Sequence, residues 1–83
     1  MTGEALPFIT AVHVLAGTKV RLLFRDGATS IVDLRPFMVG AVFDEVFEWH
    51  EFDAVMADPE FGGLVWPNGA DIAPETLRDY AQE

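Results

Sequence analysis

Few side chains in this sequence could act as nucleophiles. Ser30 is the only serine, and cysteine is absent. The two histidines, His13 and His50, lie far apart, and the sequence around them suggests no Ser–His–Asp arrangement. Ser30 is also predicted to share a strand face with Val20 and Leu22, which places it toward the core. We therefore predict no catalytic residue and expect a protein that is not an enzyme.

The acids next to His50 are the best candidates for metal ligands. Glu51 and Asp53 follow this histidine closely, and imidazole together with carboxylates can hold Zn²⁺. However, the sequence contains no His-x-x-x-His pair and no calcium-loop pattern of alternating acids around a glycine. It also lacks the framework of a glycine-rich phosphate loop. We therefore predict neither a metal nor another cofactor.

The remaining chemistry is that of a charged surface with aromatic anchors. Acids spaced along a predicted helix would steer a basic partner toward it, and exposed aromatic side chains would supply affinity. The candidate interaction surface comprises Asp44, Glu45, Glu48, Trp49, Glu51, Phe61 and Trp66.

A second candidate site is the corner between Trp66 and Asp71. Asn68-Gly69 favours a tight turn, and a carboxylate at Asp71 could accept hydrogen bonds from the backbone amides of that turn. Structural and ligand-binding interpretations of Trp66, Asn68 and Asp71 both remain open. If this corner bordered a pocket, the chain would be a small ligand-binding protein or an enzyme.

Charge narrows the classes of partner. Fourteen acids against five bases give a net charge of −9, which repels nucleic acid and anionic membranes and attracts basic proteins. The sequence shows no signal peptide, and its longest uncharged run, residues 5–18 with His13 counted as neutral, is too short to span a bilayer. Together with the absence of cysteine, this predicts a soluble, cytoplasmic protein.

The elements that must position these residues fit into one domain. Residues 1–8 are predicted to be a flexible lead-in and residues 9–83 a single domain. Strands are expected over residues 9–15, 18–24 and 28–34. A three-residue turn at residues 25–27 is favoured, because it pairs Val20 with Val32, whereas a two-residue turn would place Asp33 on the apolar face.

The second half of the chain has less regular patterns. Residues 41–50 are predicted to form a helix with an apolar face, and the alternation over residues 52–57 predicts a strand. A short strand is expected at residues 64–66 and a final helix from Pro74, with Leu77 and Tyr80 facing inward. The predicted fold is α+β with the order β-β-β-α-β-β-α, in which both helices pack on a small antiparallel sheet.

The sequence also resembles a known family. The residues that carry the likeness are Val32-Asp33-Leu34 after an Asp-Gly turn, Val42-Phe43, Phe52, and the run GLVWPNGADIAPETL from Gly63 to Leu77. On these residues the chain resembles the bacterial domain of unknown function 2442 family, over about Val12 to Tyr80. The resemblance implies a small α+β domain without established activity. It further implies a role similar to that of an antitoxin or an accessory partner of a small protein.

We therefore expect a non-catalytic protein-interaction domain that binds a small basic protein. Self-association into a homodimer through an uncovered sheet edge or face is a further expectation, since small domains commonly form symmetric dimers.

Overall fold

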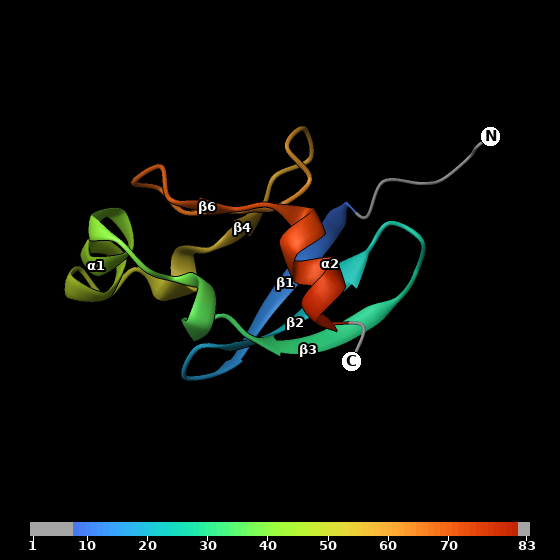
Figure 1. The fold of residues 1–83 in the computed structure, drawn as a ribbon, viewed down its shortest axis with the longest axis horizontal. Helices are drawn as coiled ribbons and strands as arrows, with labels where there is room; N and C mark the ends of the chain where they lie inside the picture. The colour runs from blue at the N-terminus through green and yellow to red at the C-terminus, as the bar shows by residue number, and fades with distance from the viewer. Residues whose placement is uncertain (1–7, 82–83) are drawn as a thin grey trace.

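The computed structural model describes the backbone of residues 8–81 and the side chains of residues 8–78. All of the predicted lead-in except Phe8, and the side chain of Tyr80, lie outside the described residues. Two three-stranded antiparallel sheets face each other, and the core lies between them (Figure 1). The first sheet has the order β1-β2-β3 and contains β1 (Ile9–Ala16), β2 (Lys19–Phe24) and β3 (Thr29–Asp33).

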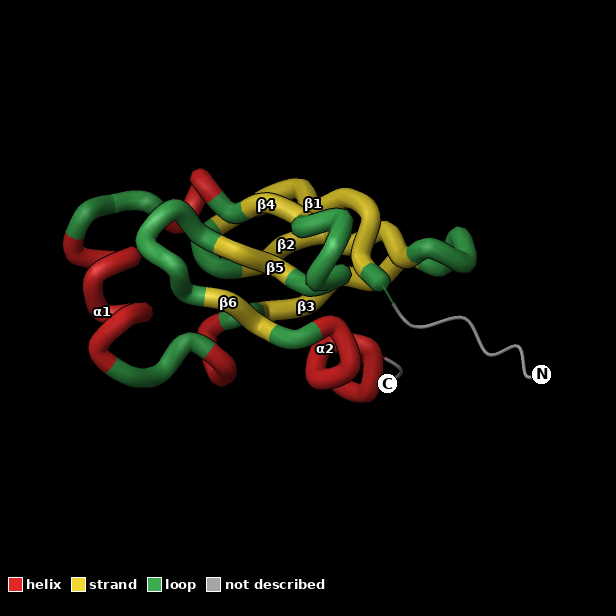
Figure 2. Tube along the Cα trace, turned by 90° about the horizontal axis from the view of Figure 1, so that it is seen from above, coloured by secondary structure: helices red, strands yellow, loops and turns green. Residues whose placement is uncertain are grey.

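The second sheet is built from three strands of two residues each. Its order is β4-β5-β6, with β4 at Met56–Ala57, β5 at Leu64–Val65 and β6 at Asp71–Ile72. Viewed from above, it lies across the first sheet, with β4 close to β1 (Figure 2). Leu22 of the first sheet and Leu64 of the second are both fully buried, so the sheets share one apolar core.

Two helices complete the fold. α1 (Ala41–Glu48) lies at one end of the molecule, beyond the ends of the strands, and α2 (Pro74–Ala81) lies beside β3 (Figure 1). Short 3₁₀ turns occur at Arg35–Phe37 and Phe52–Ala54. None of the helices within residues 8–81 is long and apolar enough to cross a membrane. The predicted α+β class and order of elements are confirmed, and the structure adds the short strand β6 and divides the strands between two sheets.

The register of the β2–β3 hairpin agrees with the prediction. Val20 pairs with Val32, and the amide of Phe24 donates to the carbonyl of Ala28 at 2.8 Å. Gly27 closes the turn with a φ of 92°, in the left-handed region that glycine enters at no steric cost. The alternation along β2 therefore buries one complete face of the strand, and the turn fixes which face it is.

Residues 52–57 do not form the predicted continuous strand. The amide of Val55 donates to the carbonyl of Phe52, so the segment begins as a 3₁₀ turn, and only Met56–Ala57 is extended. A 3₁₀ turn places residues i and i+3 on the same side, and Phe52 and Val55 are accordingly the buried pair, whereas Met56 is exposed. The predicted strand was wrong because the alternation assigned Met56, and not Val55, to the same buried face as Phe52.

Candidate functional site

The end of the molecule formed by α1 carries most of the predicted interaction surface. Asp44 and Glu48 are exposed, while Glu45 and Glu51 are half-buried. We call this region the acidic end and define it by Val42, Asp44, Glu45, Glu48, Trp49 and Glu51.

An apolar strip runs along the exposed side of α1. Val42 is 39% exposed and Trp49 is 54% exposed, so the apolar face predicted for this helix is only partly buried. Seven residues correspond to about two helical turns, so these two side chains lie on the same side of the helix. The buried side is narrower than predicted and centres on Phe43 and Val46. The outcome is an exposed tryptophan next to carboxylates.

The C-terminus of α1 is capped by a residue other than glycine in the left-handed conformation. The amide of His50 donates to the carbonyl of Phe47 at 3.1 Å, and that of Glu51 donates to Val46 at 2.9 Å. This pair of bonds is a Schellman motif, in which the residue at the position of His50 must be left-handed. His50 has a φ of 56° and is exposed. The helix therefore ends two residues earlier than predicted, and Trp49 projects from its last turn.

Trp66 lies beneath the acidic end and takes no part in its surface. It is 3% exposed, and its Nε1 donates to the carbonyl of Phe52 at 3.1 Å. Its ring meets that of Phe43 edge-on at 5.4 Å between centroids. The prediction that Trp66 is an exposed anchor is therefore wrong: the indole is a core residue that supports α1, and its one polar atom is satisfied internally.

Asn68 connects the predicted corner to α1. Its Nδ2 donates to the carbonyl of Val42 at 2.9 Å and to Oε1 of Glu45 at 3.1 Å, and its Oδ1 accepts from the amide of Ala70 at 3.0 Å. The side chain thus shapes its own turn and also fixes the helix. Sequence reasoning placed Asn68 in a turn but did not foresee its contact with α1.

Asp71 does not accept the expected hydrogen bonds from the backbone amides of the turn. It is exposed in β6, opposite Val65, and its carboxylate makes no hydrogen bond to the described residues. Asn68 provides the bond to the turn amide instead. Because Trp66 is buried below the turn while Asp71 is exposed on a strand, the three residues of the predicted ligand corner do not converge on one site.

Phe61 is separate from the acidic end. It is 39% exposed and belongs to the turn between β4 and β5, which lies away from α1 in both views (Figures 1 and 2). Oδ1 of Asp58 accepts from the amides of Glu60 and Phe61 and so shapes this turn. Of the three candidate aromatic anchors, only Trp49 is both exposed and next to the acids of α1.

The remaining candidate side chains form no reactive cluster. His13 is exposed on β1 and pairs with Arg21, whereas His50 lies at the end of α1. Ser30 is half-buried opposite Leu22, on the face predicted for it. Among the described residues, no three His, Asp or Glu side chains lie close enough together to hold a metal ion.

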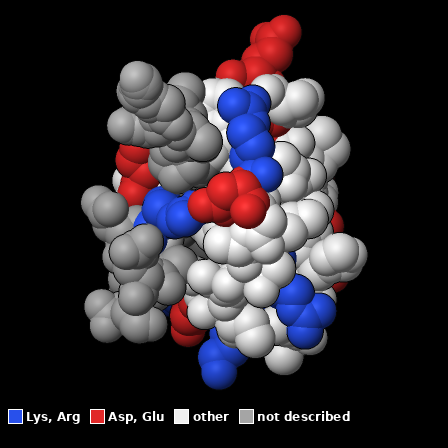
Figure 3. Space-filling view, turned by 90° about the vertical axis from the view of Figure 1, so that its right-hand side faces the viewer, with Lys and Arg blue, Asp and Glu red and all other residues white. Residues whose placement is uncertain are grey.

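The two ends of the molecule differ in charge. Residues 36–77 contain nine Asp and Glu and no Lys or Arg, and this stretch includes all of α1. The end opposite α1 carries several Lys and Arg side chains, interspersed with acids (Figure 3). There Arg78 contacts Asp26 at 2.8 Å, and this hydrogen bond lowers the pKa of the Asp26 carboxyl. Five of these nine acids lie within residues 44–53, in or directly after α1, and the guanidinium of Arg35 lies over the ring of Phe47 there, so this end keeps an excess of negative charge.

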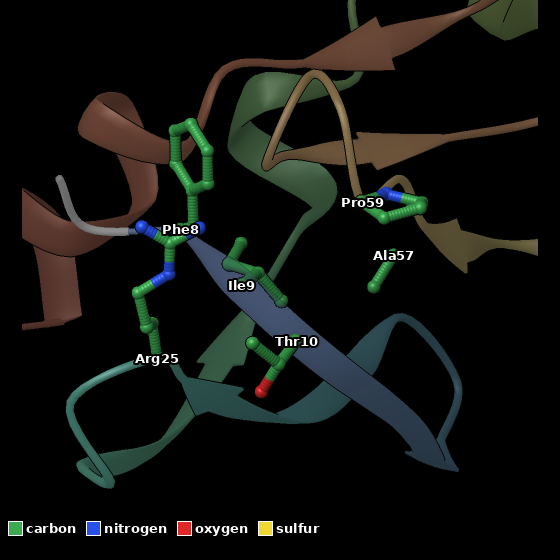
Figure 4. A pocket seen from close by; sticks show the side chains of 6 residues that line it. All are labelled: Phe8, Ile9, Thr10, Arg25, Ala57 and Pro59. Atoms are coloured by element: carbon green, nitrogen blue, oxygen red, sulfur yellow. The ribbon is translucent and has the colours of Figure 1, made fainter.

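A cavity of about 320 Å³ lies at the start of β1, next to the turn that follows β4. It is lined by Phe8, Ile9, Thr10, Arg25, Ala57 and Pro59 (Figure 4). The guanidinium of Arg25 stacks over the ring of Phe8 at 4.7 Å, so the one cation of the lining already has an aromatic partner. None of the predicted site residues contributes to this cavity.

The corner and α1 both lie in a region that matches a family model. A family model described as "Protein of unknown function (DUF2442)" matches residues 9–83. The chain belongs to this family. The resemblance identified from the sequence is thus confirmed over nearly the whole chain. No match was found among curated proteins or among solved structures.

Proposed function

We propose that this member of the DUF2442 family is a non-catalytic protein-interaction domain whose acidic end binds a basic protein. The observation that carries the proposal is the exposure of Trp49 and Val42 on one side of α1, next to Glu45 and Glu48. Tryptophan is enriched among the residues that dominate binding energy, and surrounding charges select and steer the partner.

The acidic end is held in place before any partner arrives. Asn68 fixes the start of α1, and Trp66 supports its buried side. Phe47 stacks on Phe52 at 6.4 Å between centroids, and the guanidinium of Arg35 lies 4.7 Å from the ring of Phe47. A surface that is already ordered loses less conformational entropy on binding, which favours affinity.

The proposed partner is a small basic protein that presents an apolar residue among Lys and Arg side chains. The apolar group would cover Trp49, and the cations would face Asp44 and Glu48. In this proposal the chain is the antitoxin-like or accessory member of a pair, located in the cytoplasm. The absence of cysteine supports a reducing compartment.

The test is affinity capture with matched charge variants. The tagged chain is used at low salt to capture proteins from the cells that produce it, beside Asp44→Asn/Glu48→Gln and Trp49→Ala variants. The control, Glu60→Gln/Glu75→Gln, removes two exposed acids elsewhere, and each double variant includes one acid from the first turn of a helix.

We expect the chain and the control to retain one basic protein in defined stoichiometry. Trp49→Ala should weaken binding at least about tenfold, as for an anchor residue, and Asp44→Asn/Glu48→Gln should mainly slow association. The proposal is wrong if no specific basic protein is retained, or if the control variant loses the partner as readily as the acidic-end variant does.

A further inference from the structure

The cavity at the start of β1 has the size and the walls of a small-molecule site. Its volume of about 320 Å³ lies at the lower end of the range for such sites, about 300–1,000 Å³. The walls are apolar, with Ile9 on one side and Ala57 and Pro59 on the other (Figure 4). Thr10, Arg25 and Pro59 are exposed, so the cavity opens to solvent.

Arg25 is the one charged residue of the lining. Its side chain extends from the turn after β2 toward the ring of Phe8 (Figure 4), with the guanidinium carbon 4.7 Å from the ring centroid. Stacking uses the face of a planar guanidinium, so N–H groups at its edge stay available as hydrogen-bond donors. The described residues give Arg25 no carboxylate partner, because the one ion pair among them joins Arg78 to Asp26. A cation without a counter-ion therefore lies beside an apolar cavity.

The backbone around Phe8 holds this cation in place. The amide of Arg25 donates to the carbonyl of Phe8 at 2.8 Å, and the amide of Ile9 donates to the carbonyl of Gly62 at 2.7 Å. The ring of Phe8 packs against Gly62, where an added Cβ atom would overlap the ring. Phe8 thus contacts both the turn between β4 and β5 and the guanidinium. A cation that is already positioned loses less conformational entropy when a ligand binds.

We propose that this cavity binds a small apolar carboxylate, with the carboxylate on the guanidinium of Arg25 and the apolar part of the molecule against the walls. A planar carboxylate matches the fork of N–H groups on a guanidinium, and hydrogen bonds between two charged groups are among the strongest in proteins. Thr10 cannot replace Arg25 as the donor, because its hydroxyl already donates to the carbonyl of Leu23 at 3.2 Å.

Charge favours a carboxylate over a phosphate as the anion. The lining holds one cation, and Asp58 and Glu60 are the sequence neighbours of Pro59 in it. The whole chain carries a net charge of −9. A phosphate group carries close to two negative charges at neutral pH, so one of them would stay uncompensated in this field. The single charge of a carboxylate is neutralised by Arg25.

NMR titration of the ¹⁵N-labelled chain with hexanoate tests this site without any basic partner, so its outcome is independent of the proposed function. Hexanamide is the matched neutral probe, because it has the same apolar part and no charge. We expect hexanoate to shift the amides of residues 8–10, 25 and 57–58. Hexanamide should bind at least about tenfold more weakly, because it forms no hydrogen bond between two charged groups with Arg25.

Variants of Arg25 assign the binding to this cation. Arg25→Gln should remove the preference for hexanoate over hexanamide, and Arg25→Lys should weaken hexanoate binding, because it keeps the charge but not the planar fork. The control is Arg21→Gln, which removes the same charge from an exposed position of β2 outside the lining and should leave binding unchanged.

Three results would overturn the proposal. The first is that hexanoate at millimolar concentration shifts none of the amides of residues 8–10, 25 and 57–58. The second is that hexanamide binds as tightly as hexanoate, or that Arg21→Gln weakens binding as much as Arg25→Gln. The third is that inorganic phosphate shifts the same amides at a lower concentration than hexanoate does.

Discussion

Asn68 shows how one side chain can perform two structural tasks. Its amide bonds to its own turn through Ala70 and to α1 through Val42, 26 residues away in sequence. The turn was predictable because Asn-Gly is a local signal. The contact with α1 was not, because it depends on how the second sheet is placed against the helix. Asn68 and the buried Trp66 of the corner are thus explained by structure, and the exposed tryptophan with its neighbouring acids belongs to α1.

His50 provides a test at the residue scale. Its left-handed backbone is the conformation that the Schellman motif requires, and it is unfavourable for a residue with a Cβ atom. We expect His50→Gly to increase the free energy of unfolding by about 1 kcal/mol, because relief of this strain exceeds the entropy cost of glycine. Urea denaturation measures the change.

A glycine placed elsewhere in α1 serves as the control for this prediction. Glu48→Gly introduces the same residue at an exposed, right-handed helical position. It should destabilise the fold by about 1 kcal/mol, which is the opposite sign. If His50→Gly also destabilised the protein, the histidine side chain would have to make a stabilising contact that the structure does not contain.

At the scale of elements, local patterns were predicted better than distant pairings. The β2–β3 hairpin was correct in register because alternation and a glycine turn determine it within residues 19–33. β6 was not predicted, because two residues carry no periodic signal and its pairing with β5 depends on the Asn68 turn. The same limit applies to the acidic end: the carboxylates were identified, but the burial of Trp66 and the exposure of Val42 depend on tertiary packing.

The contact between the hairpin tip and α2 predicts a dependence on pH. Arg78 donates to Oδ2 of Asp26, and the amide of Ala28 donates to Oδ1, so both bonds lower the pKa of Asp26 below its ordinary value of 3.8. A carboxyl with a lowered pKa in the folded state stabilises the fold above its unfolded pKa. This contribution is lost as the pH falls from 3.8 through the lowered value.

Asp26→Asn should therefore be less stable than the wild-type chain at neutral pH, and the difference should shrink in acid below 3.8. Chemical denaturation at neutral pH and below pH 3.8 measures the difference in the free energy of unfolding between Asp26→Asn and the wild-type chain. Glu60→Gln removes one charge at an exposed position away from α2 and controls for the general effect of net charge. A difference of the same size at both pH values would show that the charge of Asp26 does not contribute.

At the scale of the whole molecule, acidic and basic side chains are unevenly distributed. α1 presents acids and an exposed tryptophan at one end, whereas Lys19 and Arg21 lie on β2 and Arg25 lies in the turn that follows it. Long-range attraction of a basic protein would be directed toward α1, and salt should slow its association by screening that field.

The most direct test of the central claim is an NMR titration of the ¹⁵N-labelled chain with the basic protein retained by affinity capture. The account predicts that the largest shifts occur in the amides of residues 41–53 and in the indole of Trp49. The largest shifts would then decline when Trp49 is replaced by alanine. The account is contradicted if the partner instead perturbs the turn around Phe61 or the outer face of the first sheet, while the signals of residues 41–53 stay unchanged.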